Sequence, residues 1–117
     1  MREPADCLFC RVVAGELPSE EVASTERTYA FRDVKPALPV HVLVVPRDHV
    51  TSADTVTPDH ADLLAEMMTT AQHVARAQGL ADRGYRLVFN VGDDAQNSVA
   101  HLHMHLLGGR PMDWPPG

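Results

Sequence analysis

The stretch His101-Leu102-His103-Met104-His105 constrains the fold of this chain more than any other feature. Histidines alternate with large apolar residues, and successive side chains of an extended strand point to opposite faces. We therefore predict a strand that presents three imidazoles to a cleft and packs its apolar face on a core. A helix would scatter the imidazoles around its axis. The competing interpretation is a surface histidine tract with weak metal affinity.

The spacing also limits what the three imidazoles can do. On a flat strand, His101 and His105 would lie about 13 Å apart at 3.3 Å per residue, so all three cannot bind one zinc ion unless the chain bends. Covalent catalysis suits them better, because neutral imidazole is a nucleophile at pH 7 and a second imidazole supplies charge or a proton. The target would be phosphorus or a carbonyl carbon. Backbone amides of the polar loop that ends at Ser98-Val99 would bind the developing negative charge.

Length and composition exclude several classes of protein. The 117 residues are expected to form one domain, residues 1–117, and 44% hydrophobic with 22% charged residues predict a soluble globule. The formal net charge of −6 argues against a DNA or RNA binder, although a local pocket can still take a small anion. The chain has no apolar run of about 18 residues, and residues 1–6 lack the apolar region of a secretion signal. We therefore expect a cytoplasmic protein.

Local signals predict a long helix and five strands. Thr57 offers a hydroxyl cap before Pro58, and apolar residues then recur at helical spacing up to Gln78, where Gly79 suits the end of the helix. Strands are expected over residues 21–26, 28–34, 41–46, 85–91 and 101–106. These elements favour an α+β domain in which an antiparallel five-stranded sheet is covered on one face by the long helix.

A short N-terminal helix is expected over residues 7–14, with Asp6 as its cap and Gly15 as its stop. It carries Cys7 and Cys10, at a spacing that suits two thiolates on a tetrahedral zinc ion. A dithiol redox site and two ordinary packed cysteines fit the same spacing, so three interpretations stay open.

Several motifs together resemble one known family. Cys-Leu-Phe-Cys at 7–10 is followed by Gly-Glu-Leu-Pro at 15–18, Ala-Phe-Arg-Asp at 30–33, Pro-Arg-Asp-His at 46–49 and Gly-Tyr-Arg-Leu-Val-Phe-Asn at 84–90. The core His-x-His-x-His-Leu-Leu-Gly-Gly-Arg and the Trp-Pro-Pro-Gly end complete the set. Over nearly its whole length the chain resembles the histidine triad (HIT) proteins of the Hint branch. The related nucleotidyltransferase branch has Gln where this chain has His105.

The resemblance implies a HIT-like fold, a homodimer that joins two sheets, and hydrolysis of purine nucleoside 5′-phosphoramidates. It implies that His103 attacks the α-phosphorus to form a nucleotidyl-histidine, which water then cleaves to the nucleoside monophosphate. His105 would bind the phosphate, and Ser98 would donate to the phosphate or the leaving group. Asp33 would accept hydrogen bonds from both ribose hydroxyls, and Trp114 would reach over the partner's site. The remaining implied contacts are an apolar slot for the base formed by Phe9, Val12, Leu17 and Phe31, with Asn90, Asn97 and Val99 near the phosphate.

The resemblance also implies a structural zinc site. In relatives that contain the cysteine pair, it binds zinc together with a later histidine and the first histidine of the triad. The matching residues here are Cys7, Cys10, His49 and His101, a complete Cys₂His₂ set. Core packing without metal is the alternative.

Two departures from the family pattern concern the nucleotide site. Where the family usually has Gly-Gly-Gln-Ser, this chain reads Ala95-Gln96-Asn97-Ser98. The side chain of Gln96 would narrow the loop, and Asn97 reaches less far than Gln, so altered phosphate contacts are expected. Arg32 stands where His is common, which would change the edge of the base pocket.

Two alternative functions accompany the phosphoramidate hydrolase. The first is a hydrolase of dinucleoside polyphosphates, which the few basic residues near the triad disfavour. The second is a nucleotide-binding or partner-binding module with little catalytic role, since an intact triad shows capacity and not physiology. The expected partners are a purine nucleotide of the AMP or GMP class and a second copy of the chain, with no nucleic acid and no membrane.

Overall fold

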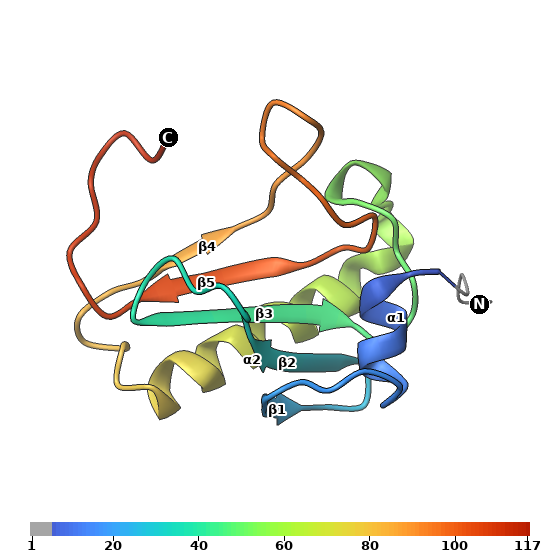
Figure 1. The fold of residues 1–117 in the computed structure, drawn as a ribbon, viewed down its shortest axis with the longest axis horizontal. Helices are drawn as coiled ribbons and strands as arrows, with labels where there is room; N and C mark the ends of the chain where they lie inside the picture. The colour runs from blue at the N-terminus through green and yellow to red at the C-terminus, as the bar shows by residue number, and fades with distance from the viewer. Residues whose placement is uncertain (1–5) are drawn as a thin grey trace.

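The fold is a five-stranded antiparallel sheet in the order β1-β2-β3-β5-β4, with helices on its two faces (Figure 1). A computed structural model describes residues 6–117, so most of the stretch judged above for a secretion signal lies outside the described residues. The predicted α+β class and antiparallel sheet are confirmed. The strands are β1 (Glu21–Ser24), β2 (Thr28–Arg32), β3 (Val40–Pro46), β4 (Arg86–Val88) and β5 (Met104–Gly108).

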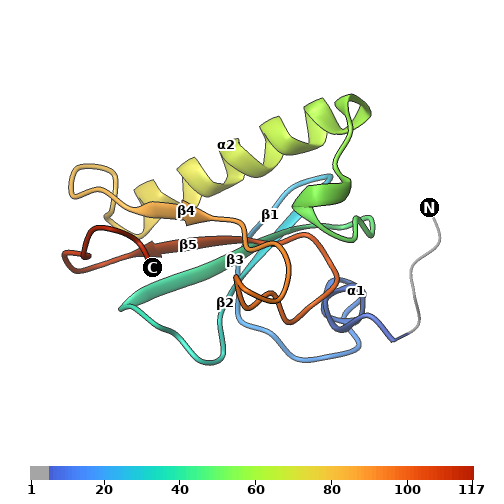
Figure 2. The same ribbon diagram turned by 90° about the horizontal axis from the view of Figure 1, so that it is seen from above.

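The long helix covers one face of the sheet (Figure 2). Thr57 caps a single 3₁₀ turn, η2 (Pro58–His60), which leads directly into α2 (Ala61–Ala77). Beyond the helix, Gly79 has φ +75°, a left-handed conformation that glycine adopts without steric cost. Another 3₁₀ turn, η1 (Ala53–Thr55), precedes this region. The start and end signals in the sequence therefore place the helix correctly.

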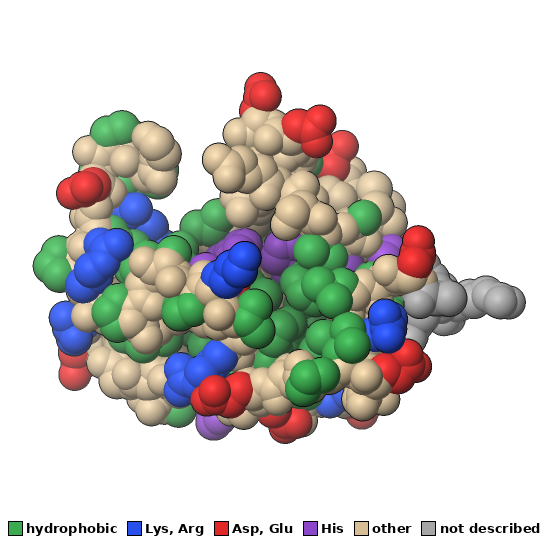
Figure 3. Space-filling model, viewed as in Figure 1, with side chains coloured by type: hydrophobic (Ala, Val, Ile, Leu, Met, Phe, Trp, Pro, Cys, Tyr) green, Lys and Arg blue, Asp and Glu red, His purple; other side chains and the backbone are tan. Residues whose placement is uncertain are grey.

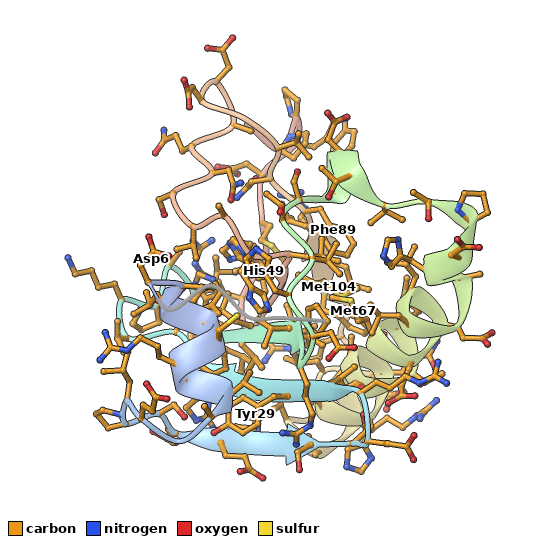
Figure 4. All side chains as sticks on the ribbon, turned by 90° about the vertical axis from the view of Figure 1, so that its right-hand side faces the viewer. Asp6, Tyr29, His49, Met67, Phe89 and Met104 are labelled. Carbon is orange, nitrogen blue, oxygen red and sulfur yellow. The ribbon has the colours of Figure 1, made fainter. Side chains whose placement is uncertain are left out.

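The main core lies between α2 and the sheet. Met67 of α2 and Met104 of β5 lie next to each other in this layer and are almost fully buried (Figure 4). Leu102 and Leu106 join them from the histidine-rich stretch, as the alternation predicts. The three apolar side chains of that stretch thus anchor on the helix side and leave the opposite face of the sheet to the imidazoles.

A second, smaller core lies on that opposite face. It packs α1 (Leu8–Val13) onto β2 and β3, with Phe9 contacting Phe31 edge to face at 5.6 Å between ring centroids. The predicted cap of this helix is wrong. Cys7 and not Asp6 is the N-cap, and its Sγ accepts from the backbone N–H of Cys10 at 3.4 Å. A thiol replaces the expected carboxylate because the cysteine side chain turns inward to the cluster described below.

The histidine stretch is less regular than predicted. β5 begins only at Met104, so His101 and His103 precede the strand and His105 alone lies within it. Residues 101–103 have no ladder pairing, but Leu102 packs in the same core as Met104 and Leu106, so the alternation of faces is kept. β4 spans three residues in place of the predicted 85–91, and β1 and β2 each end two residues earlier than expected. Among the described residues, no helix is both long and apolar enough to span a membrane.

Candidate active site

A cavity of about 630 Å³ lies between α1, the end of β2, the middle of β3 and the histidine stretch. In the space-filling view, histidine side chains form a strip in a hollow, with an apolar patch along one side (Figure 3). The cavity brings together nine residues that the sequence analysis assigned to nucleotide binding or catalysis: Phe9, Val12, Leu17, Phe31, Asp33, Ser98, Val99, His103 and His105.

His103 lies at the inner side of this cavity with a defined tautomer. Its Nδ1 lies 2.7 Å from the carbonyl oxygen of His101, and a carbonyl can only accept, so Nδ1 carries the proton. The lone pair of the neutral ring is therefore on Nε2. Phe9 packs edge to face on the ring at 5.1 Å, and His105 lies at the same centroid distance. The arrangement holds an imidazole ready to attack an electrophile in the cavity.

His105 is oriented by a residue that the sequence analysis did not identify, His41 of β3. The backbone N–H of Ala37 donates to Nδ1 of His41 at 3.0 Å, so Nε2 of the neutral His41 ring carries the proton. That Nε2 donates to Nδ1 of His105 at 2.8 Å and lies 3.4 Å from a carboxylate oxygen of Asp33. Nε2 of His105 consequently carries a proton. The Asn90 amide nitrogen lies 3.5 Å from it, and a turn of that amide by 180° would place the oxygen there as the acceptor. His105 thus presents a hydrogen-bond donor beside His103.

Burial keeps both of these rings neutral near pH 7. It lowers the pKa of His105 to about 4, an effect that His103 and His41 reinforce and the Asp33 carboxylate opposes. Burial also lowers the pKa of His41, again against the opposing effect of Asp33. One signal in the sequence pointed to His41, namely a single imidazole in the apolar run 41–46, where a buried polar group needs a partner.

The rim of the cavity carries charged side chains. Asp33 accepts from the backbone N–H of Lys35 at 2.8 Å, which fixes its carboxylate at the mouth. Lys35 is the only lysine of the chain, is exposed, and lines the cavity. Arg32 also lines it, but its guanidinium donates to Glu20 at 2.7 Å and to Gln78 at 3.2 Å.

Three predicted site residues, Asn90, Asn97 and Trp114, lie outside the cavity lining. Gln96 adopts φ +60° in the loop before the triad, where the family usually has glycine, and the neighbouring Asn97 has a buried Oδ1 without a partner in the described part of the chain. Asn90 reaches the site only through His105. Trp114 is 80% exposed and lies near the Arg86 guanidinium, 5.7 Å from the ring centroid. Its predicted role at a partner's site stays a prediction.

A second cluster adjoins the triad on the α1 side. Cys7, Cys10, His49 and His101 are all buried, and their candidate ligand atoms all lie within 4.8 Å of one another. Nδ1 of His101 lies 3.2 Å from Sγ of Cys7 and 3.4 Å from Sγ of Cys10. Nδ1 of His49 lies 3.4 Å from Sγ of Cys10.

The donor set of this cluster fits a tetrahedral metal ion. Typical zinc bond lengths place sulfur and nitrogen ligands about 3.5 Å apart. Nε2 of His101 donates to the carbonyl of Pro46 at 2.9 Å, which leaves Nδ1 unprotonated and able to act as a ligand. Burial lowers the pKa of His101 to about 4, which also favours the neutral, ligating form. The four residues could therefore hold a metal.

Fold and site together define a class of protein: an α+β domain that holds two neighbouring histidines, His103 and His105, at one end of an apolar cavity. The chain belongs to the HIT family, whose domain matches residues 14–112. The HIT family hydrolase from Legionella pneumophila Philadelphia 1 has a similar structure, with a TM-score of 0.94 and 45% sequence identity over 96% of this chain and 100% of that one. A HIT family hydrolase from Clostridium thermocellum has a TM-score of 0.92 and 40% sequence identity, over 95% of this chain and 96% of that one.

Two similar plant proteins carry informative names. The 14 kDa zinc-binding protein of Brassica juncea is 42% identical over 96% of this chain and its own full length. Adenylylsulfatase HINT1 of Arabidopsis thaliana is also 42% identical, over 94% of this chain and 76% of that protein.

Proposed function

We propose that this protein hydrolyses the P–N bond of purine nucleoside 5′-phosphoramidates and releases a nucleoside monophosphate through a nucleotidyl-histidine. The observation that carries the proposal is the pair of opposite tautomers: His103 offers a lone pair on Nε2, and His105 offers a proton on Nε2, with 5.1 Å between their ring centroids. The hydrolases among the similar structures support the reaction class.

Binding would follow the polarity of the cavity. The base would lie in the apolar slot between Phe9, Val12 and Phe31, where ring faces exclude water. Asp33, whose carboxylate is held at the mouth, would accept hydrogen bonds from the two ribose hydroxyls. This leaves the α-phosphate beside the imidazoles, with Ser98 exposed on the adjoining loop.

The first chemical step would then form a bond between Nε2 of His103 and phosphorus as the P–N bond to the amine breaks. The amine leaves with a proton, and Ser98 is the hydroxyl placed to donate to it. Nδ1 of His103 becomes part of an imidazolium, which the His101 carbonyl stabilises. Water next attacks phosphorus and gives a proton back to Ser98, the bond to Nε2 of His103 breaks to leave the neutral ring, and the monophosphate departs. His105 donates to the phosphate oxygens in both steps.

We further propose one structural zinc ion per chain, bound by Cys7, Cys10, His49 and His101, which would tie α1 to the triad. The name of the Brassica relative supports the choice of metal. No step of the reaction needs the ion. Neither cysteine forms a disulfide, which suits a reducing compartment such as the cytoplasm.

A homodimer is the proposed assembly. The ring of Trp114 is 80% exposed on the C-terminal arm, and Phe89 and Val91 are exposed beyond the edge strand β4. Exposed apolar groups next to an unpaired strand edge are suited to cover by a second copy. Trp114 would then shape the leaving-group side of the partner's cavity.

Adenylyl sulfate is a second candidate substrate, favoured by the name of the Arabidopsis relative. It keeps the same nucleotide and replaces the P–N bond by a P–O bond to sulfate. Hydrolysis of dinucleoside polyphosphates and a purely binding role are the remaining alternatives.

One assay separates these functions. The protein is incubated with an adenosine phosphoramidate, adenylyl sulfate and a diadenosine polyphosphate, with His103→Ala as the control. We expect the highest kcat/KM for the phosphoramidate and loss of turnover in the variant. Equal hydrolysis by both proteins would refute the mechanism, and nucleotide binding without any turnover would establish the binding role.

A further inference from the structure

The proposed nucleophile is carried by a segment that the sheet does not hold. The pairing of β5 with β3 starts at Met104, one residue before His105, so residues 101–103 have no part in the ladder. The backbone of this segment is attached to the neighbouring chain through Leu102, whose N–H donates to the carbonyl of Val50 at 2.6 Å. The position of His103 must therefore depend on side-chain contacts as well.

His101 supplies those contacts from inside the protein. Its side chain is fully buried, and Nε2 donates to the carbonyl at Pro46, the last residue of β3. Nδ1 faces the two sulfur atoms of the cysteine pair, and the ring meets His49 edge to face at 5.0 Å. The ring is thus fixed between the end of a central strand and the candidate metal cluster.

The backbone of the same residue fixes the nucleophile. The carbonyl of His101 accepts the Nδ1 proton of His103 at 2.7 Å, and this bond places the reactive lone pair on Nε2. We propose that His101 is a positioning residue that couples occupancy of the Cys7–Cys10–His49–His101 cluster to the tautomer and orientation of His103. Its catalytic consequence rests on the proposed function, whereas the structural coupling does not.

The coupling has a simple physical basis. With the cluster loaded, rotation of the His101 ring or displacement of its backbone would break a ligand bond, so the carbonyl stays on Nδ1 of His103. With the cluster empty, the ring keeps its bond to Pro46, but the cysteine thiols hold it only weakly. His103 then also samples the tautomer with the proton on Nε2, which cannot attack phosphorus. Loss of a group that orients a metal-ligating imidazole typically costs about 10- to 100-fold in metal affinity or activity, and we expect a similar range for the imidazole of His103.

The coupling between cluster occupancy and the His103 tautomer can be tested by changing His49. It belongs to the cluster but does not line the nucleotide cavity. His49→Ala removes a ligand, His49→Cys restores four ligands as a Cys₃His set, and His73→Ala on the exposed side of α2 is the matched control. Each variant is assayed for metal content, for kcat and KM, and for the ring ¹⁵N shifts of His103, which report its tautomer without any turnover.

We expect His49→Ala to lose the metal, to lower kcat about 10- to 100-fold with KM within about twofold of the wild type, and to show mixed tautomers at His103. His49→Cys should recover the metal and the Nδ1-protonated signature, and His73→Ala should match the wild type. A metal-free, folded His49→Ala with an unchanged His103 tautomer would overturn the coupling.

A second route covers the case in which His49→Ala does not fold. A cavity of about 500 Å³ on the α1 side is lined by Cys7 and His49, so a chelator can approach the cluster in the wild-type protein. Chelation should shift the His103 ¹⁵N signals, and readdition of Zn²⁺ should restore them. Unchanged signals after complete metal removal would refute the coupling, whether or not the protein hydrolyses phosphoramidates.

Discussion

Nε2 of His41 lies 2.8 Å from Nδ1 of His105, and this contact joins the central strand β3 to the candidate active site. It fixes the His105 tautomer because Nδ1 of His41 is already occupied by the N–H of Ala37. His41 of β3 thereby determines that His105 of β5 presents a protonated Nε2 to the cavity.

Removing this donor should impair catalysis while leaving the nucleotide slot intact. We expect His41→Ala to lower kcat about 10- to 100-fold, because His105 is then free to place its proton on Nδ1. His41→Gln, which can place an amide N–H near the former Nε2 position, should retain most of the activity. Steady-state kinetics with a phosphoramidate provide the measurement, and a wild-type kcat in His41→Ala would show that the contact has no catalytic role.

The pH dependence of stability should reveal the buried His105. Its pKa falls from 6.5 to about 4 in the folded protein, so the unfolded chain binds more protons between these values. The free energy of unfolding should therefore decrease as the pH falls from about 6.5 through 4. Above pH 6.5 the contribution of His105 to this free energy should be constant. His103, His41 and Asp33 face this ring.

Urea unfolding of wild type and His105→Asn across this pH range isolates the contribution of His105. The variant should lose less stability than the wild type on acidification, since one group with a depressed pKa is gone. Parallel curves for the two proteins would contradict the assignment.

Lys35 should contribute to binding through charge. It lies on the cavity rim in a chain with a net charge of −6, and no ion pair engages its ammonium within the described residues. We expect Lys35→Gln to weaken AMP binding about two- to fivefold at low salt, with little effect on uncharged adenosine. Titration calorimetry at low and high salt measures this, with Arg76→Gln on the exposed side of α2 as the control. An equal loss for AMP and adenosine would assign Lys35 a steric role.

Trp114 provides a test of the proposed dimer. Sedimentation velocity at micromolar concentration should show two copies of the chain. Trp114→Ala should raise KM several-fold for substrates with a bulky amine, without changing the affinity for the monophosphate product, because its ring would contact the leaving group only. A monomeric wild-type protein would contradict the proposed dimer. An unchanged preference among amines in Trp114→Ala would show that the ring does not contact the leaving group.

Much of the fold follows from local signals in the sequence. Thr57, Pro58 and Gly79 mark the long helix because capping and left-handed backbone are short-range effects. The alternation around His103 predicts the faces of the chain, because burial of Leu102 and Met104 against α2 requires it. It does not predict where ladder pairing starts, since that depends on the path of the chain near Val50 and the cysteine cluster.

The parts of the site that sequence reasoning missed depend on contacts between distant residues. His41 gains its role only when β3 pairs with β5, which brings it to a histidine 64 positions away. The sequence predicts Asp6 as the cap of α1 because Asp is the better local cap, whereas the turn of Cys7 toward the cluster is a tertiary effect. In both cases the sequence shows residues with the required chemistry and leaves their partners undetermined.

The covalent intermediate gives the most direct test of the central claim. Rapid quenching of the protein with an adenosine phosphoramidate, followed by mass spectrometry of intact protein and peptides, should show one nucleotidyl group per active site on His103. His103→Ala should form no adduct. Hydrolysis that proceeds at the wild-type rate with the nucleotidyl group on another residue, or in the His103→Ala variant, would contradict the account.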